Sequence, residues 1–294
     1  MNLKKLKGTG VALVTPFHKD GNIDFTSLEK LVNHVIKGGV EYLVVLGTTG
    51  ESVTLNKDEK AAVLDFICDV NQKRLPVVYG VGGSNTHEIV NQVMGIDTKQ
   101  VDAVLSVSPY YNKPSQRGII QHFKTVARAC PVPVLLYNVP GRTGSNMTAE
   151  TTLLLAAEVD NIAGIKEASG NMEQIMQIIK HKPKDFLVIS GDDGITFPLI
   201  AAGADGVISV VANAYPKAFA EMTRNALGNN MDKARALHYQ FTDLIPLLFA
   251  EGSPSGIKYI LSQKEICLDF FRLPVVPVSK PLQNKINEVI KNLK

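Results

Sequence analysis

Residues 162–170 read Ile-Ala-Gly-Ile-Lys-Glu-Ala-Ser-Gly, a short apolar run that ends in a lysine. Similar runs recur down the first two-thirds of the chain, and segments with helical spacing, such as Leu28, Leu31, Val32 and Val35, separate them. A repeat of roughly 20–35 residues is typical of β/α units. Eight such units favour a closed (β/α)8 barrel over an open doubly wound sheet. The expected strands cover residues 11–14, 42–46, 77–79, 103–107, 134–137, 162–165, 186–189 and 206–210.

The chain of 294 residues is long enough for one large barrel domain. From about residue 215 onward the pattern is helical only, with prolines between the helical segments. We therefore divide the chain into a (β/α)8 catalytic barrel at 1–225 and a C-terminal helical extension at 226–294. Within the extension, one long helix is expected over 234–250 and another over 280–294. Packing or oligomerisation is its expected use.

The composition is that of an ordinary globular protein, with 45% hydrophobic and 20% charged residues. A net charge of +3, spread along the chain, does not indicate a basic surface for nucleic-acid binding. No run approaches the ~18 apolar residues of a membrane span, and Pro16 interrupts the only candidate signal core. We expect a cytoplasmic protein in which Cys68, Cys130 and Cys267 are reduced thiols. The six histidines lack metal-ligand spacing.

Lys166 is the first candidate for chemistry. Side chains alternate along a strand, so Gly164 and Lys166 should face the barrel interior while Ile165 faces the helices. We expect partial burial to lower the pKa of Lys166 and to provide a free amine at neutral pH. Such an amine can attack a ketone and form an imine. The alternative is a lysine that extends from the strand end into solvent.

The preceding strand ends in Tyr137, and Arg142 follows in the loop. Adjacent strands lie about 4.8 Å apart, so the Tyr137 hydroxyl could reach the Lys166 amine. A phenol can carry protons during imine formation, although a core tyrosine is an equal alternative. The planar guanidinium of Arg142 suits a carboxylate, although a lone loop arginine is more often a surface charge.

After the second strand, Gly47 and Gly50 bracket Thr48 and Thr49. Backbone N–H groups and hydroxyls in such a turn form an uncharged nest for a small carboxylate. A tight turn without a ligand is the structural alternative.

Taken together, residues 47–51, 137–144 and 164–167 resemble the dihydrodipicolinate synthase family of Schiff-base aldolases. Further matches lie at 14–16, 108–114, 190–193 and 206–210, so the resemblance covers essentially the whole chain. It implies a pyruvate-dependent lyase on a TIM barrel.

The resemblance implies catalytic roles for four residues. Lys166 matches the lysine that forms the imine with pyruvate, and Tyr137 matches the proton donor and acceptor. Thr48 and Tyr111 match the other members of a proton relay, in which the tyrosine comes from a neighbouring subunit.

The resemblance also implies four substrate-binding positions. Thr49 and the backbone of Ile208 match positions that bind pyruvate, and Gly191 is placed with them. Arg142 matches the arginine that holds the carboxylate of the second substrate, L-aspartate 4-semialdehyde.

Further implications are a homotetramer built as a dimer of dimers, no cofactor, and no nucleic-acid or membrane partner. Two alternatives stay open. N-acetylneuraminate lyases and keto-deoxy-sugar aldolases are similar at the lysine and tyrosine but usually differ at the threonine pair and at Arg142. A catalytically silent barrel that only binds a partner is the alternative from another class.

Relatives that are inhibited by lysine bind it at a subunit interface. The resemblance implies that Ser52, Glu88 and Tyr110 of such a site are kept. Four positions depart from it: Val53 is bulkier, Lys57 and Lys60 stand in place of histidines, and Ser84 stands in place of an asparagine. We therefore predict weak or absent inhibition by lysine.

Overall fold

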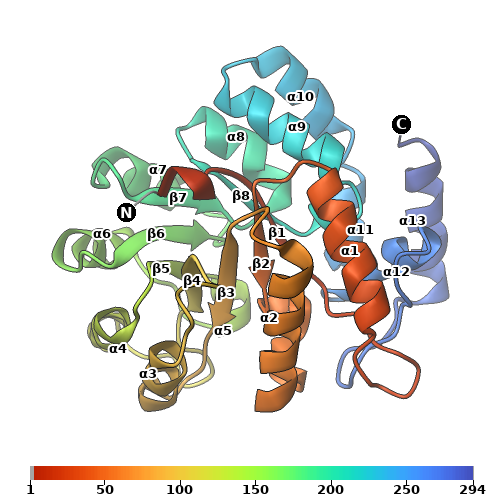
Figure 1. Cartoon of the computed structure of the whole chain (residues 1–294). Helices are drawn as coiled ribbons and strands as arrows, with labels where there is room; N and C mark the ends of the chain where they lie inside the picture. Colours follow the sequence, from red (N-terminus) through yellow and green to blue (C-terminus); the bar gives the residue numbers. More distant parts are fainter. Residues whose placement is uncertain (1–2, 294) are drawn as a thin grey trace.

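The computed structural model describes residues 3–293 and contains a closed barrel of eight parallel strands, each paired with its sequence neighbours (Figure 1). Pairing of the first strand with the eighth closes the barrel. The predicted (β/α)8 fold is therefore confirmed. The strands are β1 (Gly8–Ala12), β2 (Tyr42–Val45), β3 (Val77–Val81), β4 (Ala103–Val107), β5 (Val134–Asn138), β6 (Ile162–Glu167), β7 (Leu187–Ser190) and β8 (Gly206–Ser209).

The first strand begins at Gly8, before the apolar run at 11–14 that was expected to form it. Glycine is usually unfavourable in strands, but here the barrel interior requires it. A Cβ on Gly10 would lie 2.1 Å from the ring of Tyr42, which fills that level of the barrel. Gly8 likewise pairs closely with Gly206 where the barrel closes.

Helices surround the barrel and begin at recognisable caps. In α1, the Asp24 side chain accepts a hydrogen bond from the Ser27 amide, and the predicted stripe of Leu28, Leu31 and Val35 faces the sheet. The outer helices are α1 (Phe25–Lys37), α2 (Lys57–Asn71), α3 (Thr86–Met94), α4 (Gln116–Ala129), α6 (Ala149–Glu158), α7 (Met172–His181), α8 (Thr196–Ala201) and α9 (Pro216–Leu227).

Short helical turns occupy the loops, mostly at the ends of strands. They are η1 (Leu3–Leu6), η2 (Thr48–Gly50), η3 (Ser52–Thr54), α5 (Pro140–Thr143), η4 (Asp193–Ile195) and η5 (Val211–Asn213). Four of these follow β2, β5, β7 or β8 directly and shape the mouth of the barrel.

The C-terminal segment consists of α10 (Met231–Tyr239), α11 (Leu244–Phe249), α12 (Ser255–Gln263) and α13 (Lys280–Lys291). The prediction of a single helix over 234–250 is wrong. Pro246 has no backbone N–H and cannot donate the hydrogen bond that a continuous helix needs at that position. Helix α10 ends at Tyr239 instead, and Pro246 lies in the first turn of α11, where proline is tolerated. The helix expected over 280–294 ends at Lys291, and residue 294 lies outside the described residues.

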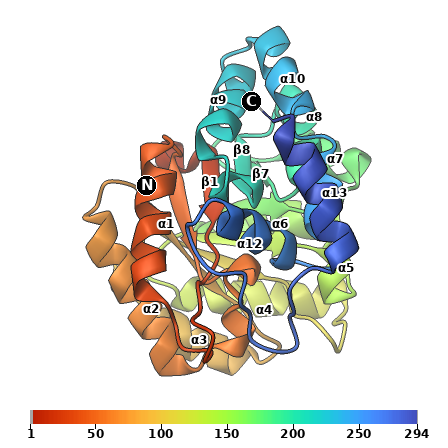
Figure 2. The ribbon, with the colours of Figure 1, turned by 90° about the vertical axis from the view of Figure 1, so that its right-hand side faces the viewer.

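The apolar side chains form two concentric layers. Ile165 and Val188 pack between the sheet and the helices, whereas Leu135 and Ile189 fill the barrel interior. Figure 2 shows the side of the molecule on which α12 and α13 lie. Over residues 3–293, none of the helices is both long enough and apolar enough to span a bilayer.

Candidate active site

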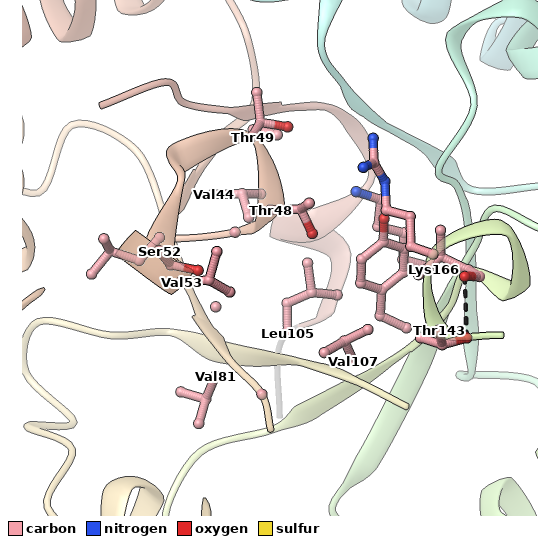
Figure 3. Close-up of a pocket in the computed structure, with 18 of the residues that line it drawn as sticks. Val44, Thr48, Thr49, Ser52, Val53, Val81, Leu105, Val107, Thr143 and Lys166 are labelled. Atoms are coloured by element: carbon pink, nitrogen blue, oxygen red, sulfur yellow. Dashed lines mark hydrogen bonds between the residues drawn. The ribbon is translucent and has the colours of Figure 1, made fainter. Parts of the chain in front are cut away.

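A cavity of about 190 Å³ opens at the C-terminal ends of the strands, where barrel enzymes place their chemistry. Figure 3 shows that apolar side chains such as Leu105 and Val107 line it together with the polar Thr48. Five predicted site residues line it, namely Lys166, Tyr137, Thr48, Thr49 and Arg142. The apolar lining comes from Ala12, Val44, Leu46, Val53, Val81, Leu105, Val107 and Val139.

Lys166 is the buried amine of this cavity, with 7% of its surface exposed. It lies on β6 directly opposite Tyr137 of β5, which is 6% exposed. The Lys166 Nζ is 4.4 Å from the centre of the Tyr137 ring. The predicted alternation is confirmed, because Ile165 belongs to the outer layer. The alternative of a lysine extending into solvent does not fit this burial.

Glu167, the next residue, was not predicted to matter. Its carboxylate faces away from the cavity and is fully buried. It accepts hydrogen bonds from the side-chain amides of Asn138 and Gln174 and from the Ser169 amide. Burial raises the pKa of Glu167, and these donors oppose the rise. The network ties the end of β6 to the end of β5 and thus fixes the two strands that carry Lys166 and Tyr137.

The threonine pair forms η2, directly after β2. Thr49 is buried and Thr48 is exposed toward the cavity, where Figure 3 shows it above the apolar Leu105 and Val107. The Thr15 hydroxyl donates to the Gly50 carbonyl at 2.7 Å and holds the turn from below. Both threonines line the cavity, as the predicted carboxylate nest requires, while the Gly50 amide donates within the turn to the Gly47 carbonyl.

Arg142 lies on α5, a single turn that begins with Pro140 at its first position and ends at Gly144 in the left-handed region. The Arg142 side chain is exposed at the rim of the cavity. The neighbouring Thr143 hydroxyl donates to the Val139 carbonyl at 3.2 Å, which anchors the turn (Figure 3). A guanidinium in this place can meet a carboxylate that enters from solvent.

Gly191 and Ile208 do not line the cavity, but Gly191 lies against Lys166. A Cβ on Gly191 would lie 2.9 Å from Lys166 Cε and 2.7 Å from Ala168 Cβ, so only glycine leaves room for the lysine. Ile208 points into the barrel interior from β8.

Asp193 fixes the turn after β8, a role that the sequence did not suggest. Its Oδ2 accepts hydrogen bonds from the amides of Val210 and Val211, at 2.9 and 3.0 Å. Burial raises the pKa of Asp193 to about 6. The carboxylate thereby links the loop after β7 to the segment that follows Ile208.

Tyr111 lies outside the cavity of its own chain. It is 90% exposed and has a φ of 73°, whereas Tyr110 lines the cavity. The Ser84 hydroxyl donates to the Tyr110 carbonyl at 2.8 Å. A positive φ on a bulky residue is uncommon and points to a constrained position. Within one subunit, the structure does not bring Tyr111 to Lys166.

The chain is similar to known proteins over nearly its whole length. The sequence model of the dihydrodipicolinate synthetase family matches residues 5–293. A 4-hydroxy-tetrahydrodipicolinate synthase of Flavobacterium psychrophilum is 54% identical over 286 residues, covering 97% of this chain and 98% of the relative. The solved dihydrodipicolinate synthase of Aquifex aeolicus is 40% identical, with a TM-score of 0.94 and 98% of each chain covered. That of Acinetobacter baumannii, complexed with pyruvate, is 38% identical, with a TM-score of 0.95 and 98% coverage of both chains.

Proposed function

The chain belongs to the dihydrodipicolinate synthetase family, and we propose that Lys166 is the amine on which its reaction takes place. The activity is that of a 4-hydroxy-tetrahydrodipicolinate synthase. Such an enzyme condenses pyruvate with L-aspartate 4-semialdehyde through a Schiff base, in the diaminopimelate route of lysine biosynthesis. The observation that carries the assignment of Lys166 is its burial in the cavity, directly opposite Tyr137.

In the first step, the Lys166 amine adds to C2 of pyruvate, and the carbinolamine loses water to give an imine. Tyr137 is the proton carrier for this step, since its ring lies beside the amine. Thr48 passes the proton toward Tyr111 of the partner subunit. Thr49 and the backbone of Ile208 hold the pyruvate, with Gly191 leaving space beside the lysine.

In the second step, the imine loses a proton from C3 and becomes an enamine. The enamine carbon bonds to the aldehyde carbon of L-aspartate 4-semialdehyde, whose carboxylate Arg142 binds at the rim. The substrate amine then attacks C2, the bond to Lys166 breaks, and the ring closes with the lysine free again. The lysine itself provides the electron sink.

The assembly we propose is a homotetramer, a dimer of dimers in which each tight pair exchanges Tyr111. The support is the exposure of Tyr111 beside an otherwise complete cavity, and a two-fold interface makes such an exchange reciprocal. A cytoplasmic location and the division into a barrel at 1–225 and an extension at 226–294 remain proposals as well.

The experiment that tests this function compares two reactions of the purified protein. One assay supplies pyruvate with L-aspartate 4-semialdehyde, and the other supplies N-acetylneuraminate and follows its cleavage. We expect product in the first assay only. Faster cleavage of N-acetylneuraminate would favour the sugar-aldolase alternative, and inactivity in both would favour a silent barrel.

A further inference from the structure

Behind the threonine pair lies an ion pair that is removed from solvent altogether. The Lys258 ammonium donates to Glu51 Oε1 at 2.6 Å, and the two side chains are 0% and 1% exposed. Glu51 lies two residues after Thr49, whereas Lys258 lies on α12 of the C-terminal segment. The pair therefore joins the loop of the active site to the extension.

The Lys258 ammonium has three further contacts. Besides Glu51, the Lys258 ammonium donates to the Phe270 carbonyl at 2.8 Å. It also lies 4.4 Å and 4.6 Å from the ring centres of Phe17 and Phe271, within the range of cation–π attraction. Burial raises the pKa of Glu51 and lowers the pKa of Lys258, so each charge depends on the other.

A second residue of the extension holds the same loop. The Arg272 guanidinium donates to the Thr54 carbonyl and forms two hydrogen bonds with the Glu59 carboxylate, at 2.8 and 2.6 Å. The Arg272 amide also donates to Glu51 Oε2 at 3.4 Å. Lys258 and Arg272 thus hold both ends of the short segment from Glu51 to Thr54.

The backbone of Glu51 connects this anchor to the threonine pair. Glu51 adopts a left-handed conformation, with φ 52° and ψ 32°, and its amide donates to the Thr48 carbonyl at 3.1 Å. For a residue with a side chain, this conformation persists only when the surroundings hold it in place. Movement of the Glu51 carboxylate would therefore change the turn that presents Thr48 and Thr49.

A gain in stability does not explain the pair well. Removal of two charges from water costs about as much as their attraction returns, and apolar side chains of the same volume often serve stability better. The position of this ion pair next to the turn of Thr48 and Thr49 indicates that it fixes the conformation of that turn.

We propose that Glu51 and Lys258 are positioning residues, through which the C-terminal extension sets the placement of Thr48 and Thr49 and thereby the rate of imine formation at Lys166. The inference rests on the proposed function of Lys166 and extends it to the helical segment. Neither Glu51 nor Lys258 lines the cavity, so neither acts as a reacting group.

The test is the rate at which a pyruvate adduct accumulates, measured by mass spectrometry after rapid mixing and reduction with borohydride. The variant is Lys258→Met, which keeps the length of the side chain and removes the ammonium. We expect adduct formation to slow by roughly tenfold to a hundredfold, because small misplacements of binding groups have effects of that size. The KM for pyruvate should rise more than the KM for L-aspartate 4-semialdehyde.

A matched control exists at the opposite end of the barrel. Lys182 donates to the Asp205 carboxylate and to the Phe186 carbonyl, with 15% and 9% of the two side chains exposed. Lys182→Met likewise removes an ammonium that bonds a carboxylate and a backbone carbonyl, although Asp205 keeps its ion pair with Lys7. It should lower the melting temperature while leaving adduct formation at the parent rate. Should Lys258→Met fail to fold, the double variant Glu51→Gln/Lys258→Met buries no charge and provides the same comparison.

The outcomes distinguish the positioning role of Glu51 and Lys258 from the proposed role of Lys166. Slow adduct formation in a folded Lys258 variant, with the Lys182 variant at the parent rate, supports positioning. Parent rates in folded Lys258→Met or in the double variant would overturn it and leave the function of Lys166 intact. Absence of a pyruvate adduct in the parent protein would overturn the proposed function, and the positioning role with it.

Discussion

The Nζ of Lys166 lies 4.4 Å from the centre of the Tyr137 ring, because the two residues are paired directly across β6 and β5. Both side chains are more than nine-tenths buried. The proposed nucleophile and the proposed proton carrier thus lie on paired strands of the barrel, where backbone pairing fixes their separation.

Tyr137→Phe tests the role of the hydroxyl. The phenyl ring still fits, so we expect a folded protein whose kcat falls roughly 10²- to 10⁴-fold, the usual contribution of a positioned proton carrier. Steady-state assays measure the effect. Tyr42→Phe is the control, since Tyr42 is also buried in the barrel but donates to the Val207 carbonyl, and it should keep most of the activity. Parent kcat in Tyr137→Phe would remove Tyr137 from the mechanism.

Gly191→Ala tests whether space beside the lysine matters. The new Cβ would lie 2.9 Å from Lys166 Cε and must displace it. We expect about tenfold slower adduct formation with pyruvate, together with about 1–3 kcal/mol less stability from overpacking. Gly95→Ala, where the nearest atom is 3.7 Å away, is the control with parent rates. An unchanged adduct rate in Gly191→Ala would show that Lys166 tolerates the displacement.

Complementation tests the exchange of Tyr111 between subunits. Tyr111→Phe and Lys166→Ala subunits should each be nearly inactive alone. In a mixed pair, one site regains both residues, so activity should return after the two variants are unfolded together and refolded. Tyr111→Phe mixed with the double variant Tyr111→Phe/Lys166→Ala is the control and should stay inactive. No recovery in proven mixed oligomers would contradict the exchange.

Weak or absent inhibition by lysine is the fourth prediction. Lys57 is exposed at the first position of α2, Lys60 is half-buried, and Val53 is 81% exposed. The ammonium groups of Lys57 and Lys60 would repel the ammonium of a bound lysine. Two like charges about 6 Å apart repel each other by roughly 3 kcal/mol at an effective dielectric of ~20, before salt screening. Activity measured against rising lysine concentration checks the prediction. The double variant Lys57→His/Lys60→His should be more sensitive, whereas sub-millimolar inhibition of the parent would contradict it.

The sequence predicted the barrel from its eight β/α repeats, and it predicted that Lys166 and Tyr137 both face the interior, because side chains alternate along a strand. It misplaced the start of the first strand, since the reason for Gly10 lies in the ring of Tyr42, 32 positions further along the chain. The break before α11 was missed although Pro246 indicates it.

The Glu51–Lys258 pair could not be predicted from local pattern, because 207 positions separate its members. One signal was present, namely a lysine between Ile257 and Tyr259 in an otherwise apolar turn of α12. A charge in such a place requires a buried partner. Only the folded chain identifies which of the acidic residues it is.

The most direct test of the account is to locate the covalent adduct that forms with pyruvate. Borohydride reduces an imine to a stable amine, so digestion and peptide mass analysis identify the modified lysine. We expect the adduct on Lys166, dependent on pyruvate and absent from Lys166→Ala. A pyruvate-dependent adduct on another lysine, or none on the active parent protein, would contradict the assignment of Lys166 as the nucleophile.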